Sequence, residues 1–273
     1  MNALVAGVTY LIVFAFGASV GSFLNVVVYR LPAGLSLLRP PSRCPQCLHQ
    51  LGKTENVPVL GWLWLKGRCR HCKSPISGRY PLVEAVTGLL FLLVFWMFEV
   101  SLQTLGYWAF LSWLLALSLI DFDTMTLPNP LTKSGLVIGL LFQVAVGWLD
   151  ATSGMGVINQ LWNGIAGAVL GIWLFESIRI FGSIVFRKDA MGAGDPKLAA
   201  MMGAWLGWKY LLLAGFLSCA VGAFVGGGAI ALGLLNRRQP MPFGPFLALG
   251  AALTVFWGET ILSAYLRLFF PLN

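Results

Sequence analysis

Long apolar segments recur along most of this chain and constrain its fold more than any other feature. A membrane-spanning helix needs about 20 consecutive apolar residues, and we expect eight spans, of which the sixth is short for a complete crossing. They cover residues of about 4–28, 82–100, 104–121, 131–149, 159–185, 196–207, 209–235 and 243–269. A membrane β-barrel would instead show segments of about ten residues that alternate in polarity. The sequence therefore predicts an all-α polytopic membrane protein.

The charged residues agree with this class. Only 10% of the 273 residues are charged, and the net charge is +8, whereas soluble domains carry about 25% charged residues. Nine of the 18 Lys and Arg residues lie between Arg30 and Arg79, in the one long polar segment. Basic loops stay on the cytoplasmic side of a membrane. The charge distribution therefore indicates topology, and we expect no nucleic-acid partner.

The same rule orients the chain. With residues 29–81 inside, the N-terminus lies outside, and the segments around 121–130 and 186–195 lie inside. The turn at Arg237–Arg238 is again inside, and the C-terminus lies outside. The first apolar run has no basic segment before it and is long enough to span, so we expect a signal anchor and not a cleaved signal peptide.

Two Cys-x-x-Cys pairs, 21 residues apart, lie in the polar segment: CPQC with Cys44 and Cys47, and CRHC with Cys69 and Cys72. This spacing is typical of a structural zinc site, in which four protein ligands leave no open position for catalysis. The alternatives to a zinc site are a pair of disulfides, which are disfavoured in the cytoplasm, and free thiols. His71 is an alternative ligand, and Cys219 is expected to be a small buried residue. We expect a first transmembrane helix over 1–28, a cytoplasmic zinc-binding domain over 29–81 and a helical bundle over 82–273.

Two acidic residues lie at predicted span ends on the cytoplasmic side. Asp121 closes the third span in LIDFDTMTLPN, and Asp195 opens the sixth in MGAGDPKL. Carboxylates that share a site do not both ionise readily, so one can act as base and the other as acid, as in an aspartic protease.

Each acid also has an alternative interpretation. Asp195 precedes a proline, which is typical of a helix N-cap, and Asn129 has the same arrangement. Asp123 and Asp121 would point about 200° apart on a helix, so at most one of them faces the site. Further glutamates near or within spans keep ion or proton transport open: Glu84, Glu176 and Glu259.

Taken together, the motifs resemble the type IV prepilin peptidases, bifunctional membrane enzymes of type II secretion and type IV pilus systems. The resemblance runs nearly end to end. It rests on GSFLNVVVYRLP, the two cysteine pairs, SGRYPLVEAVTGLLF, LIDFDTMTLPN, MGAGDPKLAAMMGAWLGW and PMPFGPFLALG.

The resemblance implies a function and a set of residues. Such enzymes cleave the basic leader of prepilins or pseudopilins after a glycine, and then methylate the new N-terminus with S-adenosylmethionine. Their GxGD motif matches Gly192, Gly194 and Asp195, and their first catalytic aspartate aligns with Asp121, with Asp123 as the alternative. The four cysteines match the zinc motif of the family. No residue is assigned to S-adenosylmethionine, although residues 21–32 and the zinc loop are where we would expect it.

The expected setting is the bacterial inner membrane, with the zinc loop and the active site on the cytoplasmic side. Expected partners are the preproteins, the phospholipid bilayer, and secretion or pilus assembly components. Three alternatives stay open: a peptidase without methyltransferase activity, a membrane transporter that uses buried acids, and a non-catalytic assembly factor with a zinc loop.

Overall fold

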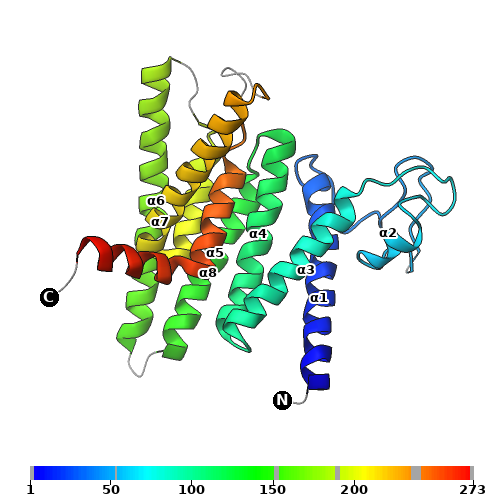
Figure 1. The fold of residues 1–273 in the computed structure, drawn as a ribbon, viewed down its shortest axis with the longest axis horizontal. Helices are drawn as coiled ribbons and strands as arrows, with labels where there is room; N and C mark the ends of the chain where they lie inside the picture. Colours follow the sequence, from blue (N-terminus) through cyan, green and yellow to red (C-terminus); the bar gives the residue numbers. More distant parts are fainter. Residues whose placement is uncertain (1–2, 53, 151–153, 188–190, 235–240, 271–273) are drawn as a thin grey trace. The chain divides into compact units, whose positions relative to one another are not determined.

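The chain is built from helices joined by loops. The computed structural model describes residues 3–52, 54–150, 154–187, 191–234 and 241–270. Their helices are α1 (Ala3–Arg30), α2 (Leu60–Trp64), α3 (Arg79–Phe98), α4 (Leu102–Thr124), α5 (Asn129–Asp150), α6 (Gly154–Phe186), α7 (Asp195–Ala231) and α8 (Gly244–Phe269) (Figure 1). Among the residues described, β pairing is limited to two isolated bridges.

Seven of these helices, all except α2, are long and apolar enough to cross a membrane. The expected all-α polytopic class is therefore confirmed. The eight expected spans map onto seven helices because the sixth and the seventh both lie in α7. The turn at Arg237–Arg238, and residues 188–190 of the expected loop around 186–195, lie outside the described residues.

α7 consists of two helices that meet at Gly207. This residue has φ 73° and ψ 172°, which no α-helix contains. The first half of α7 runs antiparallel to α6, and the second half runs back parallel to it. Three contacts between α6 and α7 establish this reversal: Gly171 with Ala199, Asn163 with Gly207, and Phe175 with Gly215. The short sixth span predicted from the sequence is thus a separate helix that ends at a sharp turn.

The chain divides into two compact units, residues 1–112 and 113–273. Unit 1 contains α1, α2, α3 and the start of α4, and unit 2 contains the rest of α4 and α5 to α8. The division expected from the sequence, with boundaries after residues 28 and 81, stays a prediction about domains.

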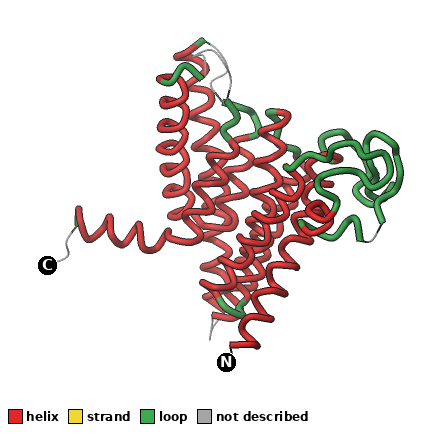
Figure 2. The backbone as a smooth tube through the Cα atoms, turned by 45° about the vertical axis from the view of Figure 1, so that its right-hand side comes forward, coloured by secondary structure: helices red, strands yellow, loops and turns green. Residues whose placement is uncertain are grey.

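Unit 1 is organised by the packing of α1 against α3. Gly17 and Gly21 lie one helical turn apart on α1, a spacing that lets two helices approach closely. A Cβ added at Gly17 would lie 2.8 Å from the Cβ of Phe91, and one added at Gly21 would lie 2.8 Å from Thr87 Oγ1. The polar segment between these helices consists of loops and α2 (Figure 2). Its two ends are joined to α1 and α3, which pack closely against each other.

Unit 2 has the first half of α7 at its core. Residues 198–206 are buried throughout. The Trp205 indole N–H donates to the carbonyl of Gly135 on α5 at 2.8 Å, and the Gln143 amide donates to the Trp205 carbonyl at 3.0 Å. A polar residue at the start of this helix is therefore brought into the interior of the unit.

Cys219 corrects one expectation. It is exposed on the second half of α7, whereas the neighbouring Ser218 is fully buried. This half packs through one face only, and in a membrane-spanning helix the other face can contact lipid. An apolar residue therefore need not be buried in protein here, and the prediction of burial is wrong.

Candidate active site and metal site

Asp121 lies in the last turn of α4, and only 5% of its surface is exposed. Its Oδ2 accepts a hydrogen bond from the backbone N–H of Gly244, the first residue of α8, at 2.9 Å. A Cβ added at Gly244 would lie 2.6 Å from the same oxygen. Only glycine brings this N–H to Asp121 without displacing the carboxylate.

Asp195 is the first residue of α7 and is 4% exposed. Its Oδ2 accepts a hydrogen bond from the backbone N–H of Gly192 at 3.1 Å. The N-cap of α7 is Gly194, and no side chain caps the helix. The interpretation of Asp195 as an N-cap is therefore wrong, because its carboxylate bonds back to the preceding loop and not forward to the helix.

The structure brings Asp121 and Asp195 together in unit 2. Their charges lie close enough to repel each other, and both side chains are buried. Two carboxylates in one buried site are most stable when they share a proton. Asp123 is exposed, in agreement with the angle expected on a helix, so it does not belong to this buried pair.

Loop packing holds the two acids in place. A Cβ added at Gly194 would lie 2.7 Å from the Cβ of Leu127, in the connection between α4 and α5. Close by, the Lys197 ammonium donates to the side-chain oxygen of Asn129 at 2.8 Å and links the starts of α7 and α5. The sequence suggested no role for Leu127 or Lys197. The motif PMPFGPF contains Gly244, but its spacing gave no sign that this residue contacts Asp121.

The four cysteines of the polar segment form a second site, in unit 1. Their sulfur atoms all lie within 4.8 Å of one another. The Sγ atoms are 3.8 Å apart in the pair Cys44–Cys72 and 3.9 Å apart in the pair Cys47–Cys69. A tetrahedral ion with Zn–S bonds of about 2.3 Å would separate its sulfur ligands by about 3.8 Å. The sulfur positions thus fit a tetrahedral metal ion.

The two pairs form matching turns. In the first turn, Cys44 N–H donates to the carbonyl of His49 at 2.9 Å, and in the second, Cys69 N–H donates to the carbonyl of Ser74 at 2.9 Å. His71 is not part of the sulfur cluster, since its ring lies against that of His49 with centroids 3.5 Å apart. The four cysteines therefore form a better ligand set than one that includes His71, whose ring contacts His49.

The pKa values of the cysteine thiols are shifted in different directions. The backbone N–H of Cys47, with help from the Ser74 hydroxyl, lowers the pKa of Cys44 to about 6. The Ser74 hydroxyl also lowers the pKa of Cys72. The backbone N–H of His49 acts to lower the pKa of Cys47, but loss of hydration and the neighbouring thiols outweigh it and raise the pKa to about 11. A divalent cation would offset half of the charge of four thiolates in this small volume and so favour their deprotonated form.

Known proteins match both halves of the chain. The model of the bacterial peptidase A24 N-terminal domain matches residues 15–98, and that of the type IV leader peptidase family matches residues 108–227. A prepilin leader peptidase/N-methyltransferase of Aeromonas hydrophila is 39% identical, over 94% of this chain and 94% of the relative. The chain belongs to the type IV leader peptidase family.

Other members of this family agree. Proteins of the same name from Stutzerimonas stutzeri and Pseudomonas aeruginosa are 38% and 39% identical, over 92% of this chain and 91% of each relative. No solved structure matches the chain. The four cysteines fall in the segment matched by the N-terminal model, and both buried aspartates fall in the segment matched by the leader peptidase model.

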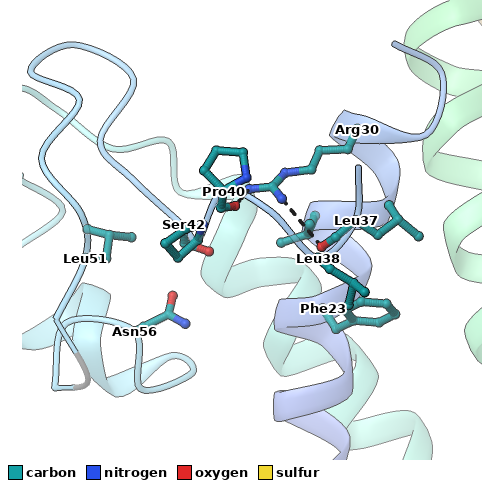
Figure 3. A pocket seen from close by; sticks show the side chains of 10 residues that line it. Phe23, Arg30, Leu37, Leu38, Pro40, Ser42, Leu51 and Asn56 are labelled. Atoms are coloured by element: carbon teal, nitrogen blue, oxygen red, sulfur yellow. Dashed lines mark hydrogen bonds between the residues drawn. The ribbon is translucent and has the colours of Figure 1, made fainter. Parts of the chain in front are cut away.

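This family member also has an open cavity of about 280 Å³ between the end of α1 and the polar segment. Figure 3 shows Arg30 extending from α1 toward Leu37 and Pro40, whose carbonyls accept its hydrogen bonds. The wall includes Phe23, and Asn56 adds a polar group. The cavity has the mixed apolar and polar lining of a small-molecule site.

The glutamates that kept transport open have local partners or lie outside the core. Glu84 accepts a hydrogen bond from the backbone N–H of Val59 at 2.7 Å, and Glu176 forms an ion pair with Arg179. Glu259 is exposed. No observation on these residues favours transport.

Proposed function

We propose that this chain is a membrane aspartyl endopeptidase that removes the basic leader of prepilins or pseudopilins after a glycine, and then methylates the new N-terminus. Its catalytic residues are Asp121 and Asp195. The observation that carries this proposal is the burial of these two carboxylates in one site, within a chain of the leader peptidase family.

The shared site supplies the two proton transfers that peptide hydrolysis needs. The ionised carboxylate takes a proton from water, which attacks the scissile carbonyl, and the protonated one donates to the leaving amine. Gly192 and Gly244 each donate a backbone N–H to one carboxylate. These hydrogen bonds fix the orientation of the acids while leaving the other oxygen of each available for water and substrate.

The substrate reaches the site along the membrane. A prepilin has an apolar helix just past its cleavage point, and this helix can enter the bilayer beside the enzyme. The protein lies in the bacterial inner membrane, with its N-terminus outside and with the zinc loop and the aspartates on the cytoplasmic side, as basic loops require. Secretion or pilus assembly components are further partners.

The four cysteines bind zinc as a structural ion. The ion would cross-link the two turns of the polar segment and stabilise its fold, and it takes no part in cleavage.

For methylation, we place S-adenosylmethionine in the cavity between the end of α1 and the polar segment. The cofactor supplies an electrophilic methyl group when bound. The apolar wall with Phe23 suits its adenosine, and the Asn56 amide offers hydrogen bonds to it. Asn56→Ala is expected to weaken S-adenosylmethionine binding in equilibrium dialysis and to leave leader cleavage unchanged. Unchanged binding would argue against this location.

The decisive test incubates the purified protein with a prepilin and S-adenosylmethionine and determines the N-terminus of the product by mass spectrometry. Asp121→Asn and Asp195→Asn are each expected to abolish cleavage, while Asp123→Asn cleaves normally because this residue is exposed. Normal cleavage by either of the first two variants would refute the assignment. A product that is cleaved but never methylated would indicate the peptidase-only alternative.

A further inference from the structure

α2 exposes a group of apolar side chains outside the membrane-spanning segments. These residues, which we call the α2 patch, are Val57, Leu60, Leu63 and Trp64, with 41%, 62%, 57% and 83% of their surfaces exposed. They surround an apolar hollow of about 380 Å³. Exposed apolar side chains on a spanning helix are explained by lipid contact, but the α2 patch belongs to the polar segment between α1 and α3. Its exposure therefore requires another explanation.

The opposite side of α2 is fixed to the rest of the polar segment. The Trp62 indole N–H donates to the carbonyl of Ile76 at 3.0 Å. Gly61 is buried, and a Cβ there would lie 2.5 Å from the carbonyl oxygen of Glu55. Because α2 is held by this inner side, the α2 patch faces outward in a defined orientation.

A hydrogen bond sets the level of α2 relative to the membrane. The backbone N–H of Val59, which precedes α2, donates to Glu84 Oε2 at 2.7 Å. Glu84 lies on α3, which can cross a membrane from Arg79 onward, and five residues of helix advance about 7.5 Å. The headgroup region on each side of a bilayer is about 5–8 Å thick. The start of α2 therefore lies near the end of a helix that can cross the membrane, at a distance along α3 comparable to the thickness of the headgroup region.

The charges next to the α2 patch indicate which surface it meets. Lys66 and Arg68 follow α2 directly, and both are exposed. Tryptophan is enriched at membrane interfaces, and basic residues beside apolar ones bind anionic lipid surfaces. The combination of depth, Trp64 and basic neighbours matches an anionic bilayer.

We propose that the α2 patch docks into the headgroup region of the bilayer that α1 and α3 cross, with Lys66 and Arg68 binding anionic lipids. Docking of this kind holds the cysteine-containing segment flat against the membrane surface, at the level where α3 enters. The proposal depends on the membrane-spanning class of the chain and on the contacts of α2, and not on its catalytic activity.

The experiment introduces a photo-crosslinking amino acid at position 64, and in a second variant at position 60, in the full chain in nanodiscs of mixed anionic and neutral phospholipids. The control carries it at Gln50, which is exposed on the same segment, pairs with Arg43 and does not line the apolar hollow. The thermal unfolding midpoint of each variant is compared with that of the wild type to verify folding. Mass spectrometry then identifies the adducts.

We expect lipid adducts at positions 64 and 60, several-fold more frequent than at position 50, and enriched in anionic lipid over the bulk mixture. The enrichment should disappear when Lys66→Gln and Arg68→Gln are added. Absence of lipid adducts at both patch positions, or equal yields at position 50, would overturn the proposal. Adducts to a second copy of the chain, or to an added prepilin in place of lipid, would also overturn it and identify a protein partner.

Discussion

Gly244→Ala tests whether the position of the Asp121 carboxylate controls catalysis. Alanine keeps the backbone N–H that donates to Asp121 Oδ2 at 2.9 Å, so the change is steric. The added Cβ would lie 2.6 Å from this oxygen and 3.1 Å from Cγ, whereas ordinary contact begins at 3.4 Å. The carboxylate must therefore move by about 0.8 Å, the difference between 3.4 and 2.6 Å.

Misplacement of a reacting group by about 1 Å can cost about 10²-fold in rate. We thus expect single-turnover leader cleavage to slow by about 10²-fold, or about 2.7 kcal/mol of transition-state stabilisation. Prepilin affinity should change little, because Gly244 acts on the acid and not on substrate binding. The assay follows cleavage of a prepilin by the purified protein in nanodiscs. The temperature is kept below the unfolding midpoints of both the wild type and the Gly244→Ala variant.

Gly227→Ala is the matched control. The same added methyl group meets nothing within 4 Å there, so cleavage should proceed at the wild-type rate. A Gly244→Ala variant that cleaves normally would refute the reasoning. A similar loss in both variants would show that alanine perturbs the bundle in general and not the acid.

Three further expectations concern the fold and the metal site. Gly207→Ala should lower the thermal unfolding midpoint in detergent, because φ 73° and ψ 172° define a region that only glycine adopts readily and that costs other residues about 1–3 kcal/mol. An unchanged midpoint would contradict the turn within α7. Metal analysis should find one zinc ion per chain, and Cys44→Ser combined with Cys69→Ser should remove it; wild-type protein without zinc that cleaves and methylates fully would contradict the structural role. Asn129→Ala removes the acceptor of the Lys197 ammonium and should reduce the free energy of unfolding by about 1 kcal/mol. Cleavage should fall by less than about tenfold, since the hydrogen bonds of the two buried aspartates go to other residues. A complete loss of cleavage would give this residue a more direct role.

The pairing of the two aspartates could be predicted from the sequence because it follows from topology. Asp121 ends one span and Asp195 begins another, and alternation of the spans brings both to the same end of the bundle. The clustering of the four cysteines could be predicted because Cys-x-x-Cys spacing is local. Both predictions need only the order and spacing of residues along the chain.

Other features depend on contacts that no local pattern encodes. Gly244 contacts Asp121 although the two residues are 123 positions apart in the sequence. The motif around Gly244 gives no sign of this contact. Asp195 followed by proline is typical of an N-cap, yet Gly194 is the N-cap and the Asp195 carboxylate accepts its hydrogen bond from Gly192 in the preceding loop. The exposure of Cys219 could not be read from its apolar character, because lipid can replace protein as the neighbour of a residue on a spanning helix.

The two buried aspartates are held by hydrogen bonds from glycine backbone N–H groups and by few other polar contacts. In the described part of the chain, each carboxylate accepts one hydrogen bond, from Gly244 to Asp121 and from Gly192 to Asp195. Burial of an ionised carboxylate costs several kcal/mol unless hydrogen bonds or a counter-charge offset it, so this arrangement is unfavourable for stability alone. The packed first half of α7 supplies the rigidity that keeps the acids together. A buried pair with carboxylate oxygens left for other partners fits the catalytic role proposed for it. Both glycines orient the acids through backbone N–H groups, and at Gly244 an added Cβ would displace the carboxylate.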